Sequence, residues 1–178
     1  MIKRYCAVLT VLAALLLGAC GASNPALPNT IKSQDGNVRI DTPETWSAYE
    51  TEPKDNLVLA VQDGAGAFAQ VFWFPDVKDK VLKAKDYVDK ALEYYGDDAQ
   101  SAAKSIKIGS TEGYCFSYIK QGLDKDGNTY SYKGYEYFLT MKSGIVEVDI
   151  FCRYTDTEPT NEQLEQLKSI AESVQVKG

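Results

Sequence analysis

Apolar and polar residues alternate along much of this chain, as they do in strands that bury one face. In the segment 145–154 every second residue is apolar, from Val146 to Cys152. Turns that contain Gly127 and Gly144 separate the last three alternating segments, so we expect an antiparallel meander there. The same reasoning predicts strands at 37–43, 57–61, 67–74, 105–108, 112–119, 130–141 and 145–154.

Two segments change to the helical period of three to four residues. The first, 79–95, ends before Gly96, a residue typical of helix ends. The second follows Thr160, which forms a capping-box pattern with Gln163. Its expected buried stripe consists of Leu164, Leu167, Ile170, Ala171 and Val174. The order of strands and helices predicts an α+β fold in which helices flank a central antiparallel sheet.

The N-terminus has the pattern of a secretory signal. Two basic residues precede an apolar run at 7–17, which is too short to span a membrane as a helix. The run ends in Leu-Gly-Ala-Cys at 17–20, which resembles a bacterial lipobox. The resemblance implies that residues 1–19 are removed and that a diacylglyceryl group on Cys20 anchors the protein to a membrane of the cell envelope, outside the cytoplasm. The alternative is an ordinary signal peptide whose cleavage site lies beside Cys20.

Composition predicts one domain after the lipid anchor. Residues 20–35 are small and polar and contain Pro25 and Pro28, so we expect a flexible tether there and a folded domain at 36–178. Loss of the signal would change the net charge from −6 to about −8, which argues against nucleic acid as a partner. The chain has no histidine, the usual general base and the commonest metal ligand. We therefore expect no enzyme activity, no cofactor and no metal.

The predicted order of elements resembles the PsbP-like family. The chain has a strand ending in DTPETW, a hairpin ending in FWFP, a Tyr-rich strand YKGYEYFLT and a final helix QLEQLKSIAESVQV. The resemblance covers residues 36–176. That family includes the photosystem II subunit PsbP and many bacterial lipoproteins. Membership would imply an α/β/α sandwich and an accessory or interaction role, and it assigns no active-site residues.

One segment has part of a calcium-loop pattern. Asp124, Asp126 and Asn128 occupy alternate positions, as the first ligands of such a loop do. However, Thr129 stands where the loop needs glycine, and Tyr135 stands where it needs a bidentate glutamate. A hairpin turn explains the segment better.

Cys115 and Cys152 are the two cysteines of the predicted domain. Outside the cytoplasm such a pair could form a disulfide. Alternation places Cys152 on the apolar face of its strand and Cys115 opposite Tyr114 and Phe116, so we expect the two thiols on different faces of the sheet. A meander would also place one strand between them. Two free thiols are favoured, and the disulfide remains the alternative.

These observations favour an interaction or accessory module over other classes of protein. We expect its partner, another envelope protein, to bind at the less covered face of the sheet or at the Tyr-rich strand, with Tyr130, Tyr132 and Tyr135 as candidate contacts. The alternative is a module that holds a small or apolar ligand between the sheet and a helix. A hydrolase would need a nucleophile beside a base other than histidine, and no such pairing is evident.

Overall fold

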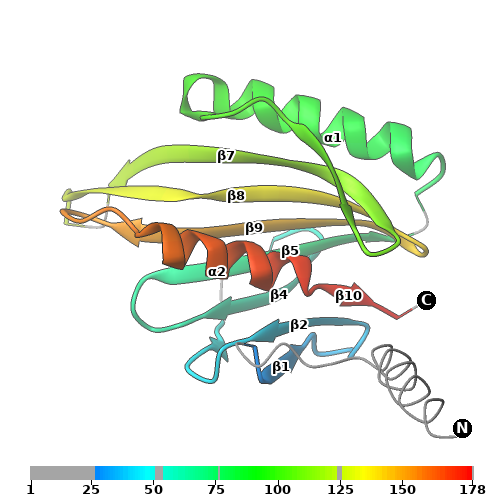
Figure 1. The fold of residues 1–178 in the computed structure, drawn as a ribbon, viewed down its shortest axis with the longest axis horizontal. Coiled ribbons are helices and arrows are strands. Elements are labelled where there is room, and N and C mark those ends of the chain that lie inside the picture. The colour runs from blue at the N-terminus through cyan, green and yellow to red at the C-terminus, as the bar shows by residue number, and fades with distance from the viewer. Residues whose placement is uncertain (1–26, 51–53, 76, 124–125, 178) are drawn as a thin grey trace, which may run out of the picture.

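The computed structural model describes residues 27–50, 54–75, 77–123 and 126–177, apart from the side chains of 80–82. The predicted signal and Cys20 lie outside these residues. The elements in chain order are β1 (Asn29–Lys32), β2 (Val38–Thr42), β3 (Ser47–Ala48), β4 (Leu57–Gln62), β5 (Ala67–Pro75), α1 (Lys80–Tyr95), η1 (Gly96–Asp98), β6 (Lys104–Ile108), β7 (Thr111–Leu123), β8 (Thr129–Met141), β9 (Gly144–Tyr154), α2 (Asn161–Glu172) and β10 (Gln175–Val176) (Figure 1). Across the described residues, neither helix has the length and apolar character needed to cross a bilayer.

The larger sheet has seven antiparallel strands in the order β3-β4-β5-β9-β8-β7-β6. Strands β7, β8 and β9 follow one another as neighbours, so the predicted meander is confirmed. The N-terminal hairpin β4–β5 joins the meander through β9, with Phe68 opposite Phe151 and Gln70 opposite Asp149. Because the paired strands are long, residues far apart in the sequence meet in rows across the sheet.

A second sheet has three strands in the order β1-β2-β10. The predicted strand at 37–43 forms β2, which pairs with β1 and β10. Strand β1 lies within the segment that we expected to be a flexible tether, and the side chain of Leu27 is only 4% exposed in the main core. Ordered structure therefore begins before residue 36, because β2 needs a neighbour along its outer edge.

The small sheet and α2 cover one face of the large sheet. Thr160 caps α2 as predicted, with its hydroxyl accepting a hydrogen bond from the Gln163 backbone at 3.2 Å. The predicted stripe of α2 is buried against side chains of β2, β8 and β9. The fully buried members of this core include Val38, Ile40, Val71, Val146, Val148, Ile150 and Ile170.

Helix α1 covers part of the opposite face. It begins and ends within one residue of the prediction, and Gly96 follows it with a left-handed φ of 52°. Its buried residues Ala84 and Val88 pack against a mainly aromatic group on β7, β8 and β9. That group consists of Phe116, Tyr118, Phe138 and Ile145.

The predicted fold class, an α+β sandwich with helices flanking one central sheet, is wrong. The described chain is mostly strand, in two sheets of three and seven strands, with two α-helices. The prediction failed because alternation identifies a strand without identifying the sheet it joins. Val38 and Ile40 bury one side of β2 in the main core, so a second sheet covers area that we had assigned to helices.

Candidate functional site

An aromatic surface lies on the α1 side of the large sheet, where β5, β9 and β8 run beside one another. Its half-buried rings form a chain of contacts. Phe68 stacks on Phe151 at 5.4 Å between ring centroids, Phe151 meets Tyr132 at 5.0 Å, and Tyr132 meets Tyr130 at 4.9 Å. The guanidinium of Arg153 lies 5.8 Å from the Phe68 ring and 5.5 Å from the Tyr130 ring. We call Phe68, Tyr130, Tyr132, Phe151 and Arg153 the aromatic surface.

The aromatic surface continues toward the end of α1. Lys120 is the cross-strand partner of Tyr132, and its ammonium lies 4.5 Å from the ring centroid of Tyr94. Tyr94 is 73% exposed, the highest value among the large apolar side chains of the described residues. Apolar contact area and positive charge therefore occur together on this face.

The predicted tyrosines divide between the two faces of the sheet. Tyr130 and Tyr132 belong to the aromatic surface. Tyr135 is an odd number of residues away and projects from the other face, where Lys168 of α2 lies 5.0 Å from its ring centroid. The three residues therefore do not form one surface. Sequence reasoning missed Phe68 and Phe151, because alternation cannot show which face of a strand is left uncovered.

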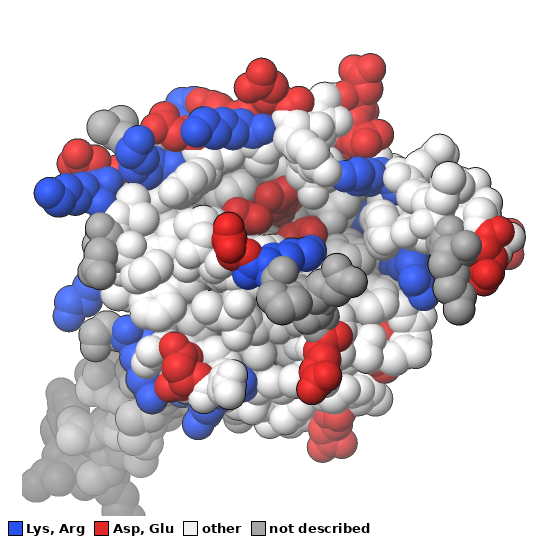
Figure 2. Space-filling view, turned by 180° about the vertical axis from the view of Figure 1, so that it is seen from behind, with Lys and Arg blue, Asp and Glu red and all other residues white. Residues whose placement is uncertain are grey.

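An acidic cavity of about 470 Å³ lies between α1 and the same face of the large sheet. Its floor contains Glu136 of β8 and Glu147 and Asp149 of β9. Glu136 and Asp149 are directly opposite each other across the two strands. Figure 2 shows this face, with acidic side chains at the bottom of a hollow and basic side chains near its margin.

The three carboxyl groups have raised pKa values. Burial, followed by repulsion from Asp149 and Glu147, raises the pKa of Glu136 to about 8. Burial also raises the pKa of Glu147 to about 7. For Asp149, burial raises the pKa to about 6 although the Tyr118 hydroxyl donates to its Oδ1 at 2.5 Å. Among the described residues, Glu136 Oε2 is buried and has no hydrogen-bond partner.

Lysines line the mouth of the acidic cavity. Lys54 Nζ donates to Gln70 Oε1 at 2.9 Å, and Lys120 Nζ donates to the Tyr94 hydroxyl at 2.8 Å. Lys90 of α1 also contributes to the lining. None of the ion pairs between described residues joins these lysines to the floor carboxylates. The cavity thus has carboxyl groups at its floor and lysines at its mouth, and we call these two groups the charge layers.

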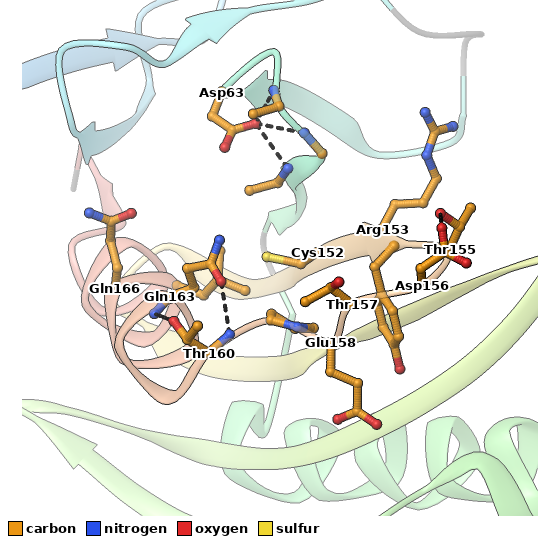
Figure 3. A pocket seen from close by; sticks show the side chains of 16 residues that line it. Asp63, Cys152, Arg153, Thr155, Asp156, Thr157, Glu158, Thr160, Gln163 and Gln166 are labelled. Carbon is orange, nitrogen blue, oxygen red and sulfur yellow. Dashed lines mark hydrogen bonds between the residues drawn. The ribbon is translucent and has the colours of Figure 1, made fainter.

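A second pocket, of about 460 Å³, lies between the β4–β5 turn and the loop before α2 (Figure 3). Asp63 Oδ1 accepts hydrogen bonds from the backbone of Ala65, Gly66 and Ala67 at 2.7–2.9 Å. Thr160, on the other side, is engaged in the cap of α2. The Asp63 carboxylate and the Thr160 hydroxyl therefore already bind the local backbone, and this pocket gives no indication of a ligand.

Cys115 and Cys152 are free thiols, as favoured from the sequence. The predicted placement on different faces is wrong, because both pack with the core on the α2 side. Strand β8 separates them, and Cys115 is aligned through Tyr137 with Val148 rather than with Cys152. Burial raises the pKa of each thiol to about 11, so both are protonated at neutral pH.

The residues of the calcium-like pattern lie at the β7–β8 hairpin. Asp126 and Asn128 precede β8, Asp124 lies outside the described residues, and Tyr135 is a strand residue. Within the described part of the chain, no group of three or more His, Cys, Asp or Glu side chains is placed to hold a metal ion.

Comparison of the sequence with models of protein families and with curated proteins gives no match. Comparison with solved structures finds the solution structure of cyanobacterial PsbP (CyanoP) from Synechocystis sp. PCC 6803, with a TM-score of 0.53. The match covers 90% of this chain and 99% of that chain at 12% identity. The fold is PsbP-like. At this identity the similarity concerns the fold alone, and the chemistry of the two surfaces described above must be judged from this chain.

Proposed function

We propose that this protein is a non-catalytic accessory module of the cell envelope that is anchored by lipid on Cys20 and binds another envelope protein. The observation that carries the proposal is the aromatic surface on the incompletely covered face of the large sheet. The PsbP-like fold supports an accessory or interaction role. The lipobox-like segment at 17–20 supports the anchor.

The composition of the aromatic surface is that of a protein interface. Phenylalanine, tyrosine and arginine are enriched at interfaces, and they dominate binding energy where neighbouring groups exclude water. In this surface the rings already hold one another by edge and stacking contacts, so little side-chain freedom would be lost on binding. The Tyr130 and Tyr132 hydroxyls, 2.9 Å apart, offer polar contacts at the rim.

The anchor would keep the folded domain near the membrane. Only residues 21–26 separate Cys20 from Leu27, the first described residue. Even a fully extended chain of this length spans no more than about 25 Å. The partner would therefore be a membrane protein or a protein held close to the bilayer.

Crosslinking and recovery from membranes tests the interaction. We expect Tyr130→Ala and Phe68→Ala to reduce recovery of the partner at least tenfold, because each removes a ring from the surface. Tyr135→Ala is the matched control, since it removes a half-buried tyrosine from the opposite face. Equal loss of partner in all three variants, or in none, would contradict the proposed surface.

Detergent partitioning tests the anchor separately. Wild-type protein should enter the detergent phase, and Cys20→Ala should remain aqueous or uncleaved, because two acyl chains are the expected source of membrane affinity. A mature wild-type protein in the aqueous phase would overturn the anchor while leaving the interaction surface untouched.

A second candidate function, ligand binding, is favoured by one observation. The acidic cavity is within the size range of small-molecule sites and contains a buried carboxylate oxygen without a partner among the described residues. The acidic floor of this cavity favours a small charged ligand over the apolar one that the alternative from the sequence also allowed.

A further inference from the structure

We propose that the acidic cavity binds a small zwitterion, with its ammonium group at the carboxylates of the floor and its anionic group at the lysines of the mouth. The inference rests on ligand binding, the second candidate function, and not on the lipid anchor or the protein partner. It follows from the position of each charge and from the partners that each charge lacks.

The floor calls for a hydrogen-bond donor with positive charge. Glu136 is only 6% exposed, and its Oε2 has no partner among the described residues. Asp149 and Glu147 lie on the neighbouring strand and add negative charge to the same floor. A buried carboxylate oxygen without a partner is unfavourable, and an ammonium group would satisfy it with a charge-assisted hydrogen bond.

The mouth calls for an anion. The hydrogen-bond partners of Lys54 and Lys120 are neutral oxygens, those of Gln70 and Tyr94. Neither ammonium forms an ion pair with a described residue. A simple cation would experience repulsion there, whereas a zwitterion would neutralise both layers at once.

The walls suit the carbon chain and the ammonium head of such a ligand. Aromatic rings also line the cavity, and a ring face attracts a cation that lies over it. These rings are Phe72, Tyr87, Tyr94, Tyr95 and Phe138. A bare metal ion fits less well, because the described carboxylates do not converge as metal ligands do.

The raised pKa values agree with this assignment. Burial, followed by repulsion from Asp149 and Glu147, raises the pKa of Glu136 to about 8 although Tyr95 and Lys120 act to lower it, so a bound ammonium group should lower it further and release a proton. The charged and titratable groups that line this cavity from every packed element are Lys54, Lys90, Tyr87, Tyr94, Tyr95, Lys120, Glu147 and Asp149.

Calorimetry on the full chain in detergent tests the proposal with three probes that share one carbon skeleton. The probes are γ-aminobutyrate, butylamine and butyrate. We expect γ-aminobutyrate to bind at least about tenfold more tightly than either singly charged probe. Proton release, measured in buffers of different ionisation enthalpy, should accompany its binding near neutral pH, and proton uptake would contradict the placement of the ammonium group at Glu136.

Two variants separate the charge layers. Glu136→Gln should weaken γ-aminobutyrate and butylamine alike, because both carry the ammonium group. Lys54→Met should weaken γ-aminobutyrate but leave butylamine unchanged or tighter. Glu44→Gln, an exposed change outside the cavity lining, is the control and should alter none of the affinities. If Glu136→Gln fails to fold, Glu147→Gln replaces it.

Different results overturn different statements. Butylamine binding as tightly as γ-aminobutyrate would overturn the zwitterion and leave a cation site. No binding of any probe at millimolar concentration would overturn the ligand class and count against the second candidate function as well. Binding that survives both Glu136→Gln and Glu147→Gln would place the probe outside this cavity.

Discussion

The two faces of the large sheet are built from the same strands but differ in chemistry. In β9, Val146, Val148 and Ile150 point to the α2 side and are fully buried. Glu147, Asp149 and Phe151, which alternate with them, point to the α1 side and line the acidic cavity or the aromatic surface. The α2 side is closed by a helix and a second sheet, whereas α1 and the segments next to it cover only part of the other side. The α2 side therefore holds the larger buried core, and the α1 side keeps polar and aromatic groups near its surface.

Removing β1 and Leu27, which help to cover the α2 side of the large sheet, should have the largest effect on stability. A fragment that begins at residue 36 lacks β1 and Leu27, whereas one that begins at residue 27 retains them. We expect the shorter fragment to be less stable by roughly 4–6 kcal/mol, because it loses a buried leucine and leaves one edge of β2 unpaired. Urea denaturation of both fragments measures the difference. Equal stability would show that β1 is dispensable and that the domain begins near residue 36.

Neighbouring residues of β9 offer a direct comparison of the two faces. Ile150 is 0% exposed on the α2 side, so Ile150→Ala should lower the unfolding free energy by about 2–4 kcal/mol. Phe151→Ala, on the α1 side, removes a larger but half-buried side chain and should lower it by about 1 kcal/mol or less. Chemical denaturation of both variants measures the two changes in unfolding free energy. A greater loss for Phe151→Ala would mean that the α1 side carries more of the core than its exposure indicates.

The acidic cavity should make stability depend on pH in an unusual direction. The pKa of Glu136 rises from 4.5 to about 8 on folding, so between these values the folded state binds more protons than the unfolded state. Stability conferred by this group is therefore present below about pH 4.5 and is lost as pH rises toward about 8. Glu147 and Asp149 act in the same direction over narrower ranges that end near pH 7 and pH 6.

Replacing Glu136 with an uncharged side chain should prevent the loss of stability between pH 4.5 and about pH 8. Glu136→Gln should stabilise the protein by about 1–3 kcal/mol near pH 8 and change it little near pH 4.5. Urea denaturation across this range measures both variants, with Glu44→Gln as the exposed control. A wild-type stability that rises between these pH values, or a Glu136→Gln variant that follows the same curve, would show that the carboxyl group is already compensated in the folded state.

Much of the secondary structure followed from local pattern. The three strands of the meander, the extent of α1 and the cap at Thr160 were all predicted, because each depends on neighbours within a few residues. The small sheet around β2 was not predicted, because the partners of β2, strands β1 and β10, lie at opposite ends of the described chain. For the same reason helices were expected where a second sheet lies.

The candidate sites show the same limit. Tyr130 and Tyr132 could be named from the sequence because tyrosine is common at interfaces, but their neighbours Phe68 and Phe151 could not. That pair meets through the β5–β9 register, which joins residues far apart in the chain. No local signal distinguishes Glu136 from the many solvated acidic residues of this protein.

The sequence alone determined the alternation of β9 and hence that its two sides differ, because side chains of a strand point to opposite faces in turn. Only the tertiary structure decided which side is sealed. It did so by pairing β2 with β1 and β10 and by placing α1 across the meander. It also decided that Glu136 and Asp149 stand opposite each other at the floor of a cavity. Burial and register are properties of the assembled chain, so the charges that distinguish this protein acquire their chemistry only after folding.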